Sequence, residues 1–110
     1  MIGVKSIIYE KNNKKLIINI DKESKIQYND ILKSLDNILV FKYLDSLYRI
    51  IDDWQKEYIN MKIIDGDRWK LTITYINGNK KEYYGKSSYP TNFEAFERLN
   101  QKLIEEVQNG

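Results

Sequence analysis

Two groups of residues in this sequence have the types and spacing needed for chemistry, and neither contains a histidine or a cysteine. The 110 residues include no His and no Cys. This composition excludes a Ser-His-Asp triad, a thiolate nucleophile, a structural zinc site and an iron–sulfur cluster. What stays open is carboxylate chemistry with a hard metal such as magnesium, or cleavage of a phosphodiester by Tyr, Lys and Arg.

The first group consists of the carboxylates Asp65, Asp67 and Glu82. An Asp-Gly-Asp segment beside a strand, with a glutamate on that strand, could bind magnesium as in a metal nuclease. Such a nuclease usually also has a lysine two residues after the strand acid, and here that position is Tyr84. Asp65-Gly66 equally suits a turn into the strand, with Glu82 facing solvent. Because turn chemistry already explains these residues, we expect no metal and no other cofactor.

The second group lies in a short stretch rich in lysine and tyrosine: Lys80, Lys81, Tyr83, Tyr84 and Lys86. These are residue types with which small bacterial toxins cleave RNA without histidine. Lysines in such a stretch also protect an edge strand against pairing with other chains. With three arginines and an isoelectric point of about 8.6, the signal for phosphate binding is weak. The sequence therefore predicts a protein that is not an enzyme.

Two predicted hairpins position these residues. The first spans 4–20, with a polar turn at 11–14. The second spans 69–85 and is the clearest local signal, because Trp69, Leu71 and Ile73 alternate with polar residues before the turn at Asn77-Gly78. Its register stays open: a two-residue loop and a three-residue loop exchange the faces on which Glu82 and Tyr83 lie.

Helices are expected in most of the remaining chain. Apolar residues spaced three and four apart from Tyr28 to Ile51 predict two helices that join near 38–41. Residues 54–67 are expected to form an ordered loop. Thr91 and Glu94 form a candidate capping box for the last helix. Its apolar stripe is Phe93, Phe96, Leu99, Leu103 and Val107.

These elements predict one α+β domain over residues 1–110. Its expected sheet has about four antiparallel strands from the two hairpins, with the helices packed on one face, in the order ββ-α(α)-ββ-α. The predicted core includes Trp69, Leu71, Ile73, Phe96 and Leu99. The hairpin segments are basic and the helical segments acidic, so a shared sheet could carry one basic face. No apolar run approaches the roughly 20 residues needed to span a bilayer. We therefore expect no membrane contact and a cytoplasmic location.

The segments 64–78, Tyr84-Gly85 and 89–93 follow the pattern D-G-x-x-W-x-L-x-I-x-Y-x-N-G, Y-G, Y-P-x-N-F. With this pattern, part of the chain resembles a small uncharacterised domain found in Gram-positive bacteria and their mobile elements. Trp54 and Tyr58 fit its W-x-x-x-Y element. The chain departs from that domain at 85–88, where Gly-Lys-Ser-Ser replaces its usual Gly-Ser-Asn-Ala. Because that domain occurs on mobile elements, the resemblance implies an inhibitor of bacterial defence, of the kind represented by phage anti-CRISPR proteins, acting inside the host cell.

The sequence thus leads to a non-enzymatic protein-binding module, whose partner would be a protein such as a bacterial defence nuclease. Nine tyrosines support this hypothesis, since tyrosine is enriched at binding hot spots, although it is also favoured in half-buried strands. The alternatives are a small basic RNA-binding or RNA-cleaving toxin-like protein, and a homodimer formed through a hairpin edge. The partner is expected on the second hairpin and the loop after it, at Lys80, Lys81, Tyr83, Tyr84, Lys86 and Tyr89.

Overall fold

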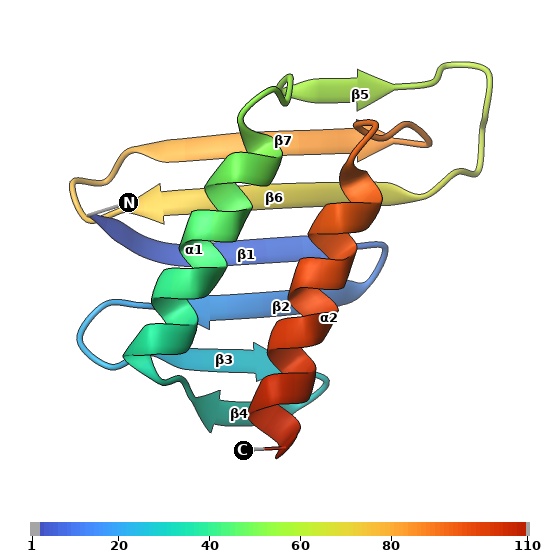
Figure 1. Ribbon diagram of the computed structural model, residues 1–110. Coiled ribbons are helices and arrows are strands. Elements are labelled where there is room, and N and C mark those ends of the chain that lie inside the picture. Colours follow the sequence, from blue (N-terminus) through green and yellow to red (C-terminus); the bar gives the residue numbers. More distant parts are fainter. Residues whose placement is uncertain (1–2, 110) are drawn as a thin grey trace.

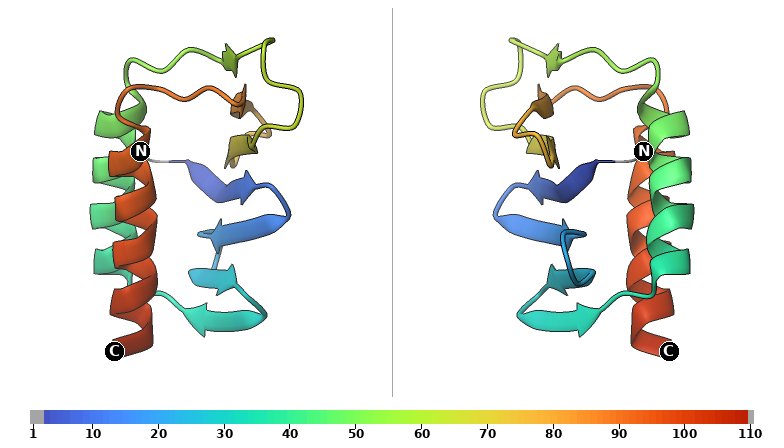
Figure 2. Two further views of the ribbon diagram at one scale, coloured as in Figure 1. Left: turned by 90° about the vertical axis from the view of Figure 1, so that its right-hand side faces the viewer. Right: turned by 90° about the vertical axis from the view of Figure 1, so that its left-hand side faces the viewer.

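The computed structural model describes residues 3–109, which form one seven-stranded sheet and two helices (Figure 1). Both helices lie on the same face of the sheet, and within residues 3–109 no helix covers the other face (Figure 2). We call the covered face the helix side and the other the open face. The elements in chain order are β1 (Val4–Lys11), β2 (Lys14–Asn19), β3 (Lys25–Tyr28), β4 (Ile31–Ser34), α1 (Asn37–Ile51), β5 (Glu57–Ile59), β6 (Arg68–Tyr75), β7 (Lys80–Lys86) and α2 (Phe93–Asn109).

The sheet has the strand order β4-β3-β2-β1-β6-β7-β5. Strands β1 to β4 form an antiparallel meander, β6 pairs with the other side of β1, and β7 follows β6. The short β5 pairs with β7 in parallel. The α+β class is therefore confirmed, but the expected antiparallel sheet of about four strands is wrong, because the sheet is mixed and has seven.

Both predicted hairpins are present. In the first, Asn12 occupies the turn with a positive φ of 56°, a conformation that asparagine tolerates. In the second, the Gly78 amide donates to the Tyr75 carbonyl at 2.9 Å and the φ of Gly78 is 91°. This three-residue loop has glycine in the left-handed position, and it fixes the register. Tyr83 pairs with Leu71 on the helix side, and Glu82 pairs with Thr72 on the open face.

The helix predicted to begin near Tyr28 is instead a third hairpin, made of β3 and β4. Its turn is Asn29-Asp30, with φ values of 46° and 64°, the left-handed pair that a tight two-residue hairpin requires. Helix α1 starts only after Asp36, whose carboxylate accepts a hydrogen bond from the Ile38 amide at 2.7 Å. The expected pair of helices is therefore a single one. The expected loop at 54–67 also contains β5.

The core lies between the sheet and the two helices. Trp69, Leu71, Ile73 and Phe96 are buried as predicted, whereas Leu99 is only partly buried. The next residue, Asn100, takes the buried position, and its side-chain oxygen accepts from the Tyr43 hydroxyl at 2.6 Å.

The start of α2 differs from the predicted capping box. Glu94 pairs with Arg98 one turn along the helix instead of reaching back to Thr91. The first turn instead uses the Asn92 carbonyl, which accepts from the Ala95 amide at 3.1 Å. None of the helices formed by residues 3–109 is both long and apolar enough to cross a membrane.

Candidate protein-interaction surface

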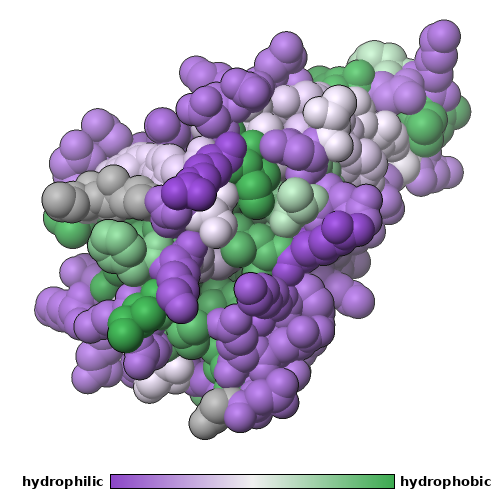
Figure 3. All heavy atoms as spheres, viewed as in Figure 1, coloured by the Kyte–Doolittle hydropathy of each residue, from purple (hydrophilic) through white to green (hydrophobic). Residues whose placement is uncertain are grey.

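The two hairpin strands β6 and β7 present different residues on their two faces. On the open face, register places Arg68 beside Lys86 and Lys70 beside Tyr84. On the helix side, Trp69, Leu71, Ile73 and Tyr83 enter the core. Surface residues on the helix side are mostly hydrophilic, with separate apolar patches between them (Figure 3).

The structure therefore divides the six residues predicted to bind a partner. Lys80, Tyr84 and Lys86 lie on the open face. Lys81 and Tyr83 alternate with them and lie on the helix side.

The helix-side members of the set have structural contacts. Tyr83 is 9% exposed and packs edge-on against Trp54, with ring centroids 5.7 Å apart. The Lys81 ammonium lies 5.7 Å from the ring centre of Tyr48. Tyr89, in the loop after β7, stacks on Trp69 and donates a hydrogen bond to Asp67 at 2.8 Å. These residues support the hairpin and are not available together with the open-face residues for one flat partner.

A groove on the open face brings residues from three segments together. It lies across β5, β6 and β7, has a volume of about 720 Å³, and we name it the β5–β7 groove. The residues that line it include Ile59, Met61, Arg68, Lys70, Tyr84 and Lys86. Three of them are exposed apolar or aromatic side chains: Met61 is 84% exposed, Ile59 43% and Tyr84 39%.

Both cations and carboxylates line the groove beside these apolar side chains: Arg68, Lys70 and Lys86, with Glu10 and Glu82. Lys70 is paired with Glu82 at 3.7 Å, which neutralises part of its charge. Arg68 and Lys86 form no ion pair with any carboxylate of residues 3–109. The groove therefore combines an apolar centre with two uncompensated positive charges at its rim. Such an arrangement suits a partner surface that is apolar in the middle and acidic around it.

The β5 side of this groove was not predicted from the sequence. Ile59 and Met61, and also the neighbouring Ile63 and Ile64, lie in a segment interpreted as a loop. Ile64 is 85% exposed and Ile63 45%. Four large apolar residues within six positions of a predicted loop indicate an exposed apolar patch. The sequence therefore contained a signal for this side of the groove.

Close backbone packing holds the groove in place. The Asn60 amide donates to the Lys86 carbonyl at 3.0 Å, which ties β5 to β7. The end of β7 fits under the Trp69 indole because residue 85 is glycine: a Cβ there would lie 2.1 Å from Trp69 Nε1. Gly66 likewise packs on Ser87, whose Oγ would be 1.2 Å from a Cβ. These contacts at Gly66, Gly85 and Asn60 form a tightly packed support beneath the groove.

The motif residues behind the resemblance form this support. Trp69 contacts Trp54, Tyr58, Tyr89 and Phe93, with ring centroids between 4.8 and 6.5 Å apart. All these contacts lie on the helix side or at the end of the sheet.

Asn92, also in the motif, joins the end of α1 to the same cluster. Its side-chain oxygen accepts from the Trp54 indole at 2.6 Å, and its amide donates to the Ile50 carbonyl at 2.7 Å. The motif thus has a structural explanation that requires no ligand.

The candidate carboxylates Asp65, Asp67 and Glu82 do not converge. Asp67 accepts hydrogen bonds from Tyr89 and Asn12, which lower the pKa of its carboxyl below the ordinary value. Glu82 lies on the open face with Lys70. Among residues 3–109, no group of three His, Cys, Asp or Glu side chains could hold a metal ion.

The tyrosines of the hairpin region are neutral at physiological pH. Burial raises the pKa of Tyr83, and burial together with the hydrogen bond to Asp67 raises the pKa of Tyr89 to about 12. Neither hydroxyl lies on the same face as Lys80 and Lys86. The sheet thus divides the Tyr/Lys group considered for RNA cleavage: Lys81 and Tyr83 lie on the helix side, whereas Lys80, Tyr84 and Lys86 stay together on the open face.

Comparison of the chain with protein-family models, with curated proteins and with solved structures finds no match.

Proposed function

We propose that this protein is a non-enzymatic protein-binding module that docks a partner in the β5–β7 groove. One observation carries the proposal: Met61, Ile59 and Tyr84 are exposed together in one groove, with Arg68 and Lys86 at its rim. Protein interfaces combine aromatic, methionine and arginine side chains at their centre with a polar rim. A few such anchors supply most of the binding energy.

The proposed partner surface is apolar in its centre and acidic at its edge. The two rim cations attract acidic residues during encounter and set the orientation of the complex. Ile59, Tyr84 and Lys86 lie on paired strands, so these residues lose little conformational entropy when they become ordered in a complex, whereas Met61 lies in the loop after β5.

A nucleic-acid partner is the weaker alternative, because the open face has few aromatic rings on which bases could stack. Tyr84 is the only aromatic residue that the strand registers of residues 3–109 place on the open face. Sheets that bind single-stranded RNA stack bases on two or three aromatic rings. Two open-face lysines are also paired, Lys15 with Glu10 and Lys70 with Glu82.

A finer proposal follows from the resemblance described above: the partner is a bacterial defence nuclease, and the protein inhibits it by covering part of its surface in the host cytoplasm. The cationic rim does not imitate the charge of a nucleic acid. We therefore expect contact with an acidic surface of the nuclease, outside any cationic channel that holds its substrate.

Site-specific photo-crosslinking in the host cell tests the proposal. Benzoylphenylalanine replaces Met61 in the groove in one variant and Phe41 on α1 in the control, because Phe41 is also an exposed apolar side chain, at 69% exposure. We expect one protein adduct from position 61 and none of the same size from position 41. Adducts sensitive to ribonuclease, a crosslinked second copy of the chain, or no adduct from position 61 would each contradict the proposal.

A further inference from the structure

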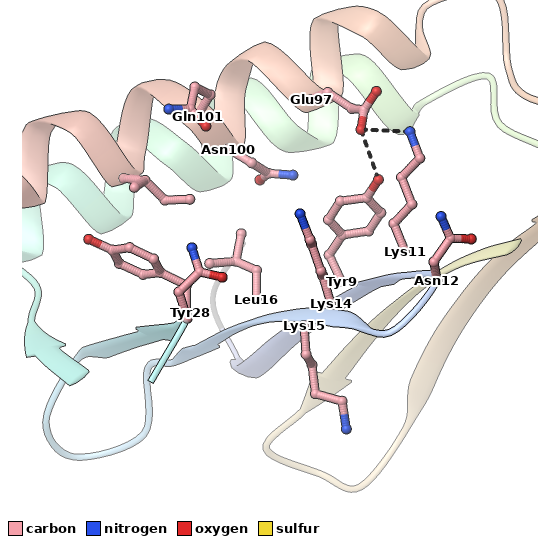
Figure 4. A pocket seen from close by; sticks show the side chains of 12 residues that line it. Tyr9, Lys11, Asn12, Lys14, Lys15, Leu16, Tyr28, Glu97, Asn100 and Gln101 are labelled. Carbon is pink, nitrogen blue, oxygen red and sulfur yellow. Dashed lines mark hydrogen bonds and ion pairs between the residues drawn. The ribbon is translucent and has the colours of Figure 1, made fainter. Parts of the chain in front are cut away.

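A second hollow lies on the helix side, away from the β5–β7 groove. It is a cavity of about 500 Å³ between α2 and strands β1 to β3 (Figure 4). Tyr9 and Leu16 line it from the sheet, and Asn100 and Ile104 line it from α2. The cavity therefore has both apolar walls and polar groups.

Asn100 places an unused hydrogen-bond donor at this cavity. The residue is 5% exposed, and its side-chain oxygen accepts from the Tyr43 hydroxyl at 2.6 Å. This bond fixes which end of the amide faces the protein. The amide nitrogen has no hydrogen-bond partner in the described residues, and it points into the space between α2 and the sheet (Figure 4). Buried donors are nearly always paired in proteins, so this one calls for a partner.

Some of the other polar groups of the cavity are also free to contact a ligand. Glu97 is already occupied, since it accepts from the Tyr9 hydroxyl at 3.2 Å and pairs with Lys11 at 3.3 Å. The buried Tyr28 hydroxyl has no partner within residues 3–109. Lys14 extends from β2 on the cavity side and forms no ion pair with the described carboxylates, whereas Lys15 points the other way (Figure 4).

We infer that this cavity binds a small organic monocarboxylate. The unused groups are donors and a cation, so the ligand must supply acceptors and negative charge. Its carboxylate accepts from the Asn100 amide and pairs with Lys14 at the cavity mouth. Its carbon skeleton lies against Leu16 and Ile104, a contact that an inorganic anion would not use. This site is separate from the proposed docking groove and does not depend on it.

The test uses nuclear magnetic resonance of the 15N-labelled chain with two probes of different skeleton, benzoate and hexanoate, and with benzamide as the uncharged match for benzoate. We expect at least one carboxylate to shift the Asn100 side-chain amide signals in a saturable way. Benzamide should bind roughly tenfold or more weakly, because it loses the charge-assisted hydrogen bond and the ion pair.

A matched pair of lysine variants locates the charge. Lys14→Gln should weaken carboxylate binding roughly fivefold or more, and Lys15→Gln, on the opposite face of the same strand, should change it less than about twofold. Both residues are exposed, so neither substitution is expected to disturb folding. Three results would overturn the inference: no saturable shift at Asn100 with either carboxylate, equal binding of benzamide, or equal losses from the two lysine variants.

Discussion

The two faces of the β6–β7 hairpin have different surroundings, although their residues alternate along the same strands. Tyr83 and Tyr84 are neighbours of identical chemistry, yet Tyr83 is 9% exposed in the core and Tyr84 is 39% exposed at the groove. The helix side carries the aromatic cluster around Trp69. The open face carries the groove with Arg68 and Lys86. Residue type alone therefore does not distinguish the buried residues of this hairpin from those that line the groove, whereas strand register does.

The comparison also changes how the motif is interpreted. Its aromatic residues and glycines hold β5, β6, β7 and α2 together around Trp69. Of the three exposed apolar residues of the groove, Ile59 and Met61 lie outside the motif, and Tyr84 belongs to it only through the Tyr-Gly step. The motif therefore predicts the scaffold of the site better than the surface that a partner would contact.

The largest effect should come from the centre of the support. Trp69→Ala removes a side chain that is 2% exposed and should lower the free energy of unfolding by about 3–5 kcal/mol. Lys70→Ala, the next residue, lies on the open face and should change it by less than about 0.5 kcal/mol. Urea denaturation followed by circular dichroism measures both. A loss below 1 kcal/mol for Trp69→Ala would remove the distinction between the faces.

The neighbouring tyrosines give the sharpest internal contrast. Tyr83→Ala should cost about 2–3 kcal/mol of stability, because it opens a space beside Trp54. Tyr84→Ala should cost less than about 1 kcal/mol and instead weaken partner binding, as expected for an interface anchor. Thermal unfolding and binding assays on the two variants measure both effects. The reverse pattern would mean that the assignment of the two faces is wrong.

Substitution of Gly85 tests how closely the end of β7 packs against the Trp69 indole. A Cβ at this position would lie 2.5 Å from the Ser88 carbonyl oxygen as well as against Trp69, so both contacts must open. Gly85→Ala should destabilise the protein by about 1–3 kcal/mol, as overpacking usually does. Differential scanning calorimetry measures this loss. Unchanged stability would show that the support is looser than described.

The smallest effect concerns pH. Hydrogen bonds from Tyr89 and Asn12 hold the pKa of Asp67 below its ordinary value of 3.8. The unfolded chain therefore binds the proton more tightly, so this stabilisation is present above about pH 4 and is lost as the pH falls through the folded-state pKa. Asp67→Asn should be less stable than the parent protein at pH 7, and the difference should shrink at pH 2–3 in urea titrations.

A second variant identifies the source of that pH dependence. Tyr89→Phe removes the hydroxyl that donates to Asp67 at 2.8 Å while keeping the ring stacked on Trp69. Tyr89→Phe should therefore lose less stability than the parent protein when the pH falls from 7 to 2–3. If the difference between Asp67→Asn and the parent protein did not vary with pH, the hydrogen bonds at Asp67 would not be the cause.

The sequence predicted the fold well where a pattern is local. The alternation from Trp69 to Tyr75 and the Asn77-Gly78 turn identified the second hairpin. The β3–β4 hairpin was missed because Ile31, Leu32 and Leu35 imitate helical spacing, although Asn29-Asp30 is a hairpin signal. Strand β5 has three residues, and its pairing with β7 spans 27 positions, so no local pattern reveals it.

The candidate site was predicted only in part for the same reason. Tyr84, Lys80 and Lys86 share the open face, but Lys81 and Tyr83 were grouped with them because the loop length that sets the register was open. Ile59 and Met61 join the groove through the pairing of β5 with β7. Their position at the groove depends on this long-range strand pairing, which no local sequence pattern predicts.

The central claim is that the groove on the open face, and not the helix side, binds the partner. The most direct measurement is the affinity of the partner captured at position 61 for two matched double variants. Tyr84→Ala with Lys86→Glu changes the groove, whereas Ile38→Ala with Lys42→Glu changes exposed positions on α1. We predict a loss of roughly 100-fold or more for the first and less than about twofold for the second, with both proteins folded. Full binding by the groove variant, or an equal loss from both variants, would contradict the account.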